Sequence, residues 1–194
     1  TGFKYIGELI GRMEAAGKGD FIFGFEESYG YLSGTFVRDK DAVIAALLTC
    51  EAAAYSKAEG YTLLDALQKL FERYGYFEEA LQSYTLPGKD GVEKIAALMD
   101  SLRSRAPQTL GGLKVTAVSD YLCSQRVSAS GIQPIELPKS NVLSFQLEGN
   151  NGVIIRPSGT EPKVKLYVGI REKTESAARA LLADAAPQRP KNHQ

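Results

Sequence analysis

The sequence predicts an α/β fold followed by an α+β fold within one chain of 194 residues. In the first half, helix-like patterns surround one short apolar run. From about residue 76, strand-like runs outnumber helical ones, which is typical of helices packed on one face of an antiparallel sheet. We therefore predict a partial mixed α/β domain over residues 1–75 and an α+β domain over residues 76–194.

Composition narrows the function classes. The chain is 44% hydrophobic and 24% charged with zero formal net charge, which disfavours a nucleic-acid-binding protein. No apolar run approaches the roughly 20 residues of a membrane helix, and the first residues do not show a signal-peptide pattern. Cys50 and Cys123 follow no disulfide or metal-ligand spacing, so we expect a cytoplasmic protein without a metal site. His193, the single histidine, lies in a terminal tail, so a histidine-based mechanism is disfavoured.

The first half begins with a predicted helix. Apolar residues recur at helical spacing from Tyr5 to Met13, and Gly17 ends the pattern. The run Phe21–Phe23 predicts a strand buried on both faces, followed by a polar loop over residues 24–30. An alanine-rich helix follows to about Lys57.

The two helices that complete this half have predicted caps. Asp39 or Asp41 is placed to cap the first, and Thr62 to cap a helix that reaches about Arg73. A single strand cannot form a self-sufficient sheet. We therefore expect a piece of a larger protein, with its apolar edge exposed or buried in a dimer.

The second half alternates strands with two helices. A strand precedes the turn at Pro87-Gly88, and one helix follows it. Later strands precede a last helix that Thr174 opens. The predicted strands cover residues 77–86, 114–118, 142–147, 153–156 and 164–171, and the first helix covers residues 92–103.

The segment "RPSGTEPKVKLYV" joins the last two strands. Gly159 can adopt a positive φ, which would turn consecutive amides toward one concavity. Ser158 and Thr160 add hydroxyl donors, and Arg156 supplies a planar fork that matches phosphate oxygens. Lys165 adds a charge on the next strand. An ordinary polar hairpin is the alternative interpretation.

A second polar loop contains Glu26, Glu27 and Ser28. It follows the predicted buried strand, at the edge where open α/β sheets place ligands. Carboxylate and hydroxyl side chains suit sugar hydroxyls. Arg38 and Lys40 lie near a helix start, where a cation opposes the helix dipole, so a role in ligand binding is plausible. A solvated acidic turn and a surface helix start are the alternatives.

In this order, "TGFK", "GFEESYG", "RDKD" and "RPSGTEPKVKLYV" resemble the α-D-phosphohexomutase family of bacterial phosphoglucomutases and phosphomannomutases. The resemblance covers essentially the whole chain. It implies the end of the family's third domain followed by its fourth, a TATA-box-binding-protein-like domain. The family's T-A-S-H-N phosphoserine loop and D-G-D-x-D-R magnesium loop do not occur in this sequence, so the resemblance is to a C-terminal fragment.

The resemblance also implies residue roles. Thr1, Glu26, Ser28 and Lys40 match positions that contact the sugar. A second set of residues matches the loop that binds the substrate's non-reacting phosphate. Relatives often carry arginine at the position of Lys165. This second set is Arg156, Ser158, Gly159, Thr160 and Lys165.

The mechanism implied for the complete enzyme is phosphoryl transfer from a phosphoserine, through a bisphosphate intermediate, between the 1- and 6-positions of a hexose. Mg²⁺ and a sugar bisphosphate activator are implied for that enzyme, and neither is expected to bind this chain. No catalytic residue is expected here, because the chain's part is to orient the phosphosugar. Tyr29-Gly30 differs from the Gly-His of the phosphomannomutase type, which favours glucose.

Two other function classes remain open. The chain could be a non-catalytic phosphosugar-binding module or a dimerising fragment. Sugar hydrolysis by Glu26 and Glu27 is disfavoured, because adjacent residues tend to point apart and no separate carboxylate partner is evident.

Overall fold

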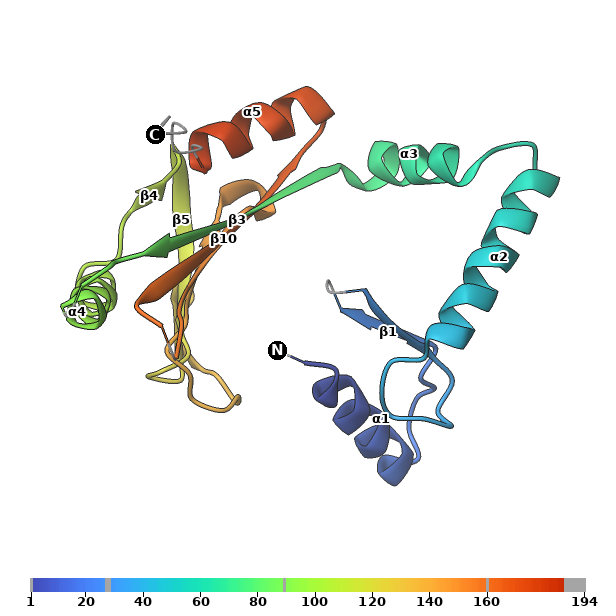
Figure 1. The fold of residues 1–194 in the computed structure, drawn as a ribbon, viewed down its shortest axis with the longest axis horizontal. Helices are drawn as coiled ribbons and strands as arrows, with labels where there is room; N and C mark the ends of the chain where they lie inside the picture. The colour runs from blue at the N-terminus through green and yellow to red at the C-terminus, as the bar shows by residue number, and fades with distance from the viewer. Residues whose placement is uncertain (1, 27–28, 89, 160, 187–194) are drawn as a thin grey trace. The chain divides into compact units, whose positions relative to one another are not determined.

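The computed structural model describes residues 2–26, 29–88, 90–159 and 161–186. The chain divides into two compact units, residues 1–69 and 70–194 (Figure 1). The domain boundary expected after residue 75 stays a prediction, because helix α3 crosses the division. No helix in the described ranges is long and apolar enough to cross a membrane.

The first unit holds three helices and a β-hairpin. The small core of this unit contains Phe3, Ile10 and Leu32. Helix α3 continues into the residues of the second unit. The elements are α1 (Lys4–Ala16), β1 (Phe23–Glu26), β2 (Gly30–Ser33), α2 (Ala42–Ala58) and α3 (Leu63–Tyr74).

Local capping interactions explain where these helices begin and end. Gly17 ends α1 with a φ of 59°, a conformation that glycine adopts without steric cost. Asp41, one of the two predicted caps, accepts from the backbone of Val43 at 2.9 Å and of Ile44 at 3.1 Å. Before α3, Thr62 and Asp65 cap each other's backbone N–H groups.

The prediction for residues 21–23 was wrong in two respects. Strand β1 begins at Phe23, includes residues expected in the loop, and pairs with β2 in an antiparallel hairpin. Ile22 is 79% exposed and Phe25 is 66% exposed, so this strand is not buried on both faces. An apolar run shows that a segment can be buried but not which neighbour covers it.

Exposed apolar side chains continue along both later helices of the first unit. Val43 and Leu47 on α2 are 81% and 61% exposed, and Leu64 on α3 is 77% exposed. Single exposed apolar residues are common, whereas several in one small unit are typical of a surface that another part of a protein covers. This agrees with the expectation that the first unit exposes apolar surface.

The described part of the second unit is built on an eight-stranded antiparallel sheet with the order β3-β10-β9-β8-β5-β6-β7, in which β4 pairs with β5. The strands are β3 (Tyr76–Thr85), β4 (Thr109–Leu110), β5 (Leu113–Asp120), β6 (Gln125–Ser128), β7 (Gly131–Pro134), β8 (Leu143–Leu147), β9 (Gly152–Pro157) and β10 (Lys163–Glu172). The helices are α4 (Gly91–Ser104), the 3-10 turn η1 (Glu148–Asn150) and α5 (Glu175–Ala185).

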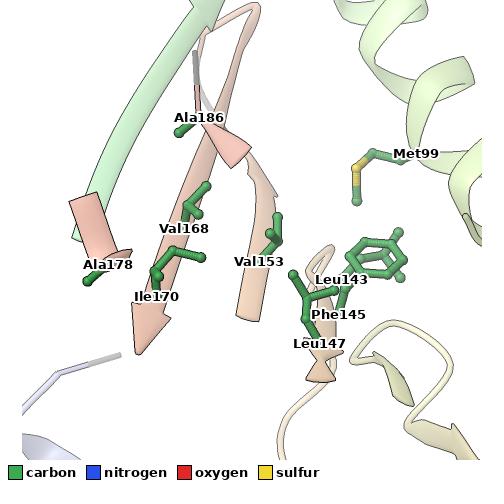
Figure 2. Packing of buried hydrophobic residues seen from close by; sticks show 9 residues of the cluster. All are labelled: Met99, Leu143, Phe145, Leu147, Val153, Val168, Ile170, Ala178 and Ala186. Atoms are coloured by element: carbon green, nitrogen blue, oxygen red, sulfur yellow. The ribbon is translucent and has the colours of Figure 1, made fainter. Parts of the chain in front are cut away.

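Helices α4 and α5 both cover one face of this sheet, as predicted. Val168 and Ile170 on β10 are 2% exposed, and Ala178 of α5 belongs to the same buried cluster. From α4, Met99 points toward Leu143 and Phe145 on β8 (Figure 2). Residues of the opposite parity on these strands therefore lie on the face of the sheet away from the core.

Helix α4 starts where the chain approaches itself closely. The backbone N–H of Leu86 donates to the carbonyl of Pro162 at 2.9 Å, which ties the segment before α4 to the turn before β10. A Cβ added to Gly91 would lie 2.1 Å from the Leu86 carbonyl oxygen and 3.1 Å from Pro162 Cβ. Glycine at this position therefore allows α4 to pack beside the turn between β9 and β10.

Replacing Gly91 with alanine should destabilise the second unit, because a backbone carbonyl cannot move away as a flexible side chain can. Overpacking of this kind costs about 1–3 kcal/mol or more. Urea unfolding followed by circular dichroism measures the change in unfolding free energy. Gly169→Ala is the control, since a Cβ there meets nothing within 4 Å and should change stability by less than about 0.5 kcal/mol. Equal effects of the two substitutions would contradict the packing argument.

Candidate functional site

Two cations lie directly opposite each other at the ends of β9 and β10. Arg156 pairs in register with Lys165, and Ser83 of β3 lies on the other side of Lys165. Their neighbours Pro157 and Val164 share the parity of the core residues, so both cations lie on the face away from the core. Arg156 is exposed and Lys165 is half-buried.

No ion pair in the described ranges involves Arg156 or Lys165. Like charges directly opposite each other on a sheet are destabilising. A bound anion would remove that cost and would gain charge-assisted hydrogen bonds from both side chains. The pair therefore has the electrostatics of an anion site.

The turn between β9 and β10 carries the hydroxyl and the glycine that the sequence singled out. The Ser158 backbone N–H donates to the Lys163 carbonyl at 2.7 Å, which holds the first residue of the turn in place. Gly159 differs from the expectation, because its φ lies outside the left-handed region. A Cβ added there would meet nothing within 4 Å, so the space above the Gly159 backbone is open to a ligand.

A hollow of about 220 Å³ lies beside this turn, on the side of helix α4. Val92, Ile95 and Ala96 of α4 form its apolar wall. Asn141, Ser158 and Gly159 line its polar side. The hollow is smaller than the sites of drug-sized ligands, and its size suits a small polar group.

A network of polar side chains holds one wall of the hollow. Arg103 of α4 donates to Asp120 Oδ2 at 3.1 Å and to the Asn141 amide oxygen. Burial alone would raise the pKa of Asp120. Hydrogen bonds from Cys123 and Leu122 and the nearby Arg103 charge outweigh burial and lower this pKa below its ordinary value. Asp120 therefore stays ionised and holds Arg103 in place at neutral pH.

In the first unit, the structure brings Glu26 and Lys40 together. Lys40 Nζ lies 3.8 Å from Glu26 Oε1 and 2.8 Å from Asp39 Oδ1. The hydrogen bond with Asp39 is the largest cause of the raised pKa of Lys40, so the side chain is a cation at neutral pH. A Cβ on Gly30 would lie 2.5 Å from Lys40 Cδ, so the glycine makes room for this contact.

Other residues that the sequence proposed have different positions. Arg38 contacts Glu14 and the Thr35 carbonyl, which ties its segment to α1 and gives it a structural role. Four residues that the sequence singled out lie outside the described residues: Thr1, Glu27, Ser28 and Thr160.

Sequence reasoning missed the hollow and the strands β2, β4, β6 and β7. Asn141 stands in a run of polar residues before β8, where a lone asparagine gives no signal of a site. Arg103 belongs to no recognisable motif. Its hydrogen-bond partner Asp120 lies 17 positions further along the chain. Only the packing of α4 against the sheet brings these residues together.

Two family models match this chain. Residues 1–74 match the model described as phosphoglucomutase/phosphomannomutase, alpha/beta/alpha domain III. Residues 92–187 match the model described as phosphoglucomutase/phosphomannomutase, C-terminal domain. The chain belongs to the phosphoglucomutase/phosphomannomutase family. Its two matches correspond to the third and last domains of that family, as the sequence motifs indicated.

Individual relatives agree with this membership. Over 173 residues the chain is 44% identical to a phosphoglucomutase of Staphylococcus aureus strain bovine RF122 / ET3-1 and 43% identical to that of strain MRSA252. Each match covers 88% of this chain and 31% of the relative. The chain therefore spans about a third of the length of these phosphoglucomutases.

The fold of a solved family structure is also similar. The crystal structure of pp63/parafusin from Paramecium, in an open form, matches 95% of this chain and 34% of its own length. The TM-score is 0.60 at 16% sequence identity, so this match supports the fold alone.

The resemblance to the family implies a Mg²⁺ ion in the complete enzyme. The described ranges contain no group of three or more histidine, cysteine, aspartate or glutamate residues that could hold a metal ion. The side chains in these ranges therefore do not fit a resident Mg²⁺.

Proposed function

We propose that this chain is the phosphosugar-binding part of a phosphohexomutase that interconverts hexose 1-phosphate and hexose 6-phosphate, with glucose as the hexose. Its second unit binds the phosphate that is not reacting, and its first unit binds the sugar. Chemistry takes place on a phosphoserine in the complete enzyme, with Mg²⁺ and a bisphosphate activator. We expect this enzyme in the cytoplasm.

The observation that carries the proposal is the pair Arg156 and Lys165. The two residues pair in register at the ends of their strands, and neither forms an ion pair in the described ranges. They lie beside a turn that contains Ser158 and Gly159, and the space above the Gly159 backbone is open. A guanidinium fork and an ammonium group on one anion suit a phosphate better than a carboxylate, because phosphate presents more oxygens and more charge. Neither contact depends on which sugar carbon carries the phosphate.

The sugar role of the first unit rests on Glu26 and Lys40. Their 3.8 Å separation leaves the carboxylate free to accept from sugar hydroxyls while the lysine neutralises its charge. Thr1 and Ser28 are proposed as further sugar contacts from the motif match. Mannose phosphate is the alternative substrate, and the dimer suggested by the sequence stays a prediction.

Phosphate titration of the isotope-labelled chain, followed by backbone amide NMR shifts, tests the phosphate site. We expect the Ser158 and Gly159 amides to shift in a saturable way, because the turn is supported by two paired strands and its donors are preorganised. Glucose 1-phosphate should produce the same shifts. Sulfate at matched ionic strength should also bind, since it has a similar shape.

Two outcomes would contradict the phosphate site. Shifts spread over all lysine and arginine neighbours, without saturation, would indicate nonspecific screening only. Saturable shifts confined to other residues would place the phosphate elsewhere and would remove the basis for the assigned roles.

A further inference from the structure

Asn141 is a polar residue on the lining of the hollow beside the turn, and the phosphate proposal does not use it. Asn141 precedes β8, two residues before Leu143, which pairs in register with Ile155 of β9. This places Asn141 level with Pro157, at the end of the sheet where the turn begins. Its side chain lines the hollow together with Ser158 and Gly159.

The orientation of the Asn141 amide follows from its partner. A guanidinium group can only donate hydrogen bonds, so the atom that faces Arg103 must be the amide oxygen. The amide nitrogen Nδ2 then points away from Arg103, and it makes no hydrogen bond within the described ranges. A donor with two N–H groups is therefore available on the wall of the hollow.

Arg103 is itself firmly held. Its side chain is 14% exposed, it lies 3.6 Å from Asp100 Oδ1, and it bonds to the ionised Asp120. A cation bonded to the amide oxygen polarises the amide and makes its N–H groups better donors. Asn141 thus connects the Asp120–Arg103 ion pair with the rim of the hollow. At the rim, its amide is an uncharged hydrogen-bond donor.

Among the described residues, one acidic side chain lines the hollow, and a neighbouring lysine compensates its charge. Glu161 is the carboxylate in this lining, and its Oε2 lies 3.3 Å from Lys163 Nζ. That ion pair compensates the charge of Glu161 locally, so the repulsion between this carboxylate and a bound anion is reduced.

We infer that Asn141 is a further ligand-binding residue, whose Nδ2 donates to an oxygen of a phosphate monoester bound at Ser158 and Gly159. Arg103 and Asp120 are positioning residues that fix the amide. Arg156 and Lys165 reach the same phosphate from the other face of the sheet end. The inference rests on the proposed function, because it adds a contact to the same phosphate.

Asn141→Asp tests this inference with little effect on the fold. The new carboxylate still accepts from Arg103, so the unfolding free energy in urea should stay unchanged or rise. The ligand-facing N–H groups become an acceptor with a negative charge, so affinity for inorganic phosphate should fall at least about tenfold, the loss expected for a hydrogen bond to a charged group. Amide NMR titration measures this affinity.

Asn150→Asp is the matched control. Asn150 is exposed in η1, at the end of β9 away from the turn, so the same added charge there should change phosphate affinity little. Wild-type affinity in Asn141→Asp, or an equal loss in both variants, would overturn the inference. If Arg156→Ala also leaves affinity unchanged, the phosphate site itself is wrong; if Arg156→Ala alone lowers it, only the role of Asn141 is wrong.

Discussion

The purified 194-residue chain is expected to give no turnover of glucose 1-phosphate, even with Mg²⁺ and a sugar bisphosphate activator present. The reaction that we propose for the complete enzyme needs a serine that accepts and returns the phosphoryl group and a metal that neutralises the developing charge. The sequence contains neither of the motifs that supply these groups in the family. Binding and orientation alone do not replace a nucleophile.

A coupled assay that reports glucose 6-phosphate measures this result. A full-length phosphoglucomutase in the same mixture is the positive control, and a buffer blank sets the background. Turnover by the chain that is well above the blank, and that persists through further purification, would show that these residues carry the chemistry and that the proposed division of roles is wrong.

Replacing Arg156 with alanine should lower the affinity of the chain for phosphate on the order of tenfold to a hundredfold. The guanidinium makes a charge-assisted contact with a doubly charged ligand, and such a hydrogen bond contributes roughly 1.5–3 kcal/mol. In the free wild-type chain Arg156 and Lys165 repel each other, and a bound phosphate relieves this repulsion. The alanine variant has no such repulsion to relieve, so the difference in phosphate affinity becomes larger. Amide NMR titration measures the affinity.

Two variants sharpen this measurement. Arg156→Lys keeps the charge but loses the planar fork, so an intermediate affinity is expected if bidentate geometry matters. Arg105→Ala removes an exposed arginine that follows α4 and should leave affinity unchanged. A loss in Arg105→Ala equal to that in Arg156→Ala would indicate a general charge effect, and the specific cradle would be rejected.

Local patterns were enough to predict most elements. The caps at Asp41, Thr62 and Thr174 follow from hydrogen bonds between residues two to three positions apart, which the sequence displays directly. The alternation in Val164–Ile170 predicted the buried side of β10 because a strand turns successive side chains to opposite faces. Short edge strands such as β7, exposed at every position, carry no such alternation and were missed.

The sequence by itself determined the family motifs, the residue types of the phosphate turn and the strands on either side of it. The tertiary structure alone decided which side chains meet. Strand pairing set Arg156 opposite Lys165, and the close approach at Gly91 set α4 beside the turn. Burial of the segment around Phe23 was also a tertiary matter, since an apolar run is covered only if another element packs on it. Contacts between residues far apart in the chain depend on how elements pack, and no local pattern records that packing.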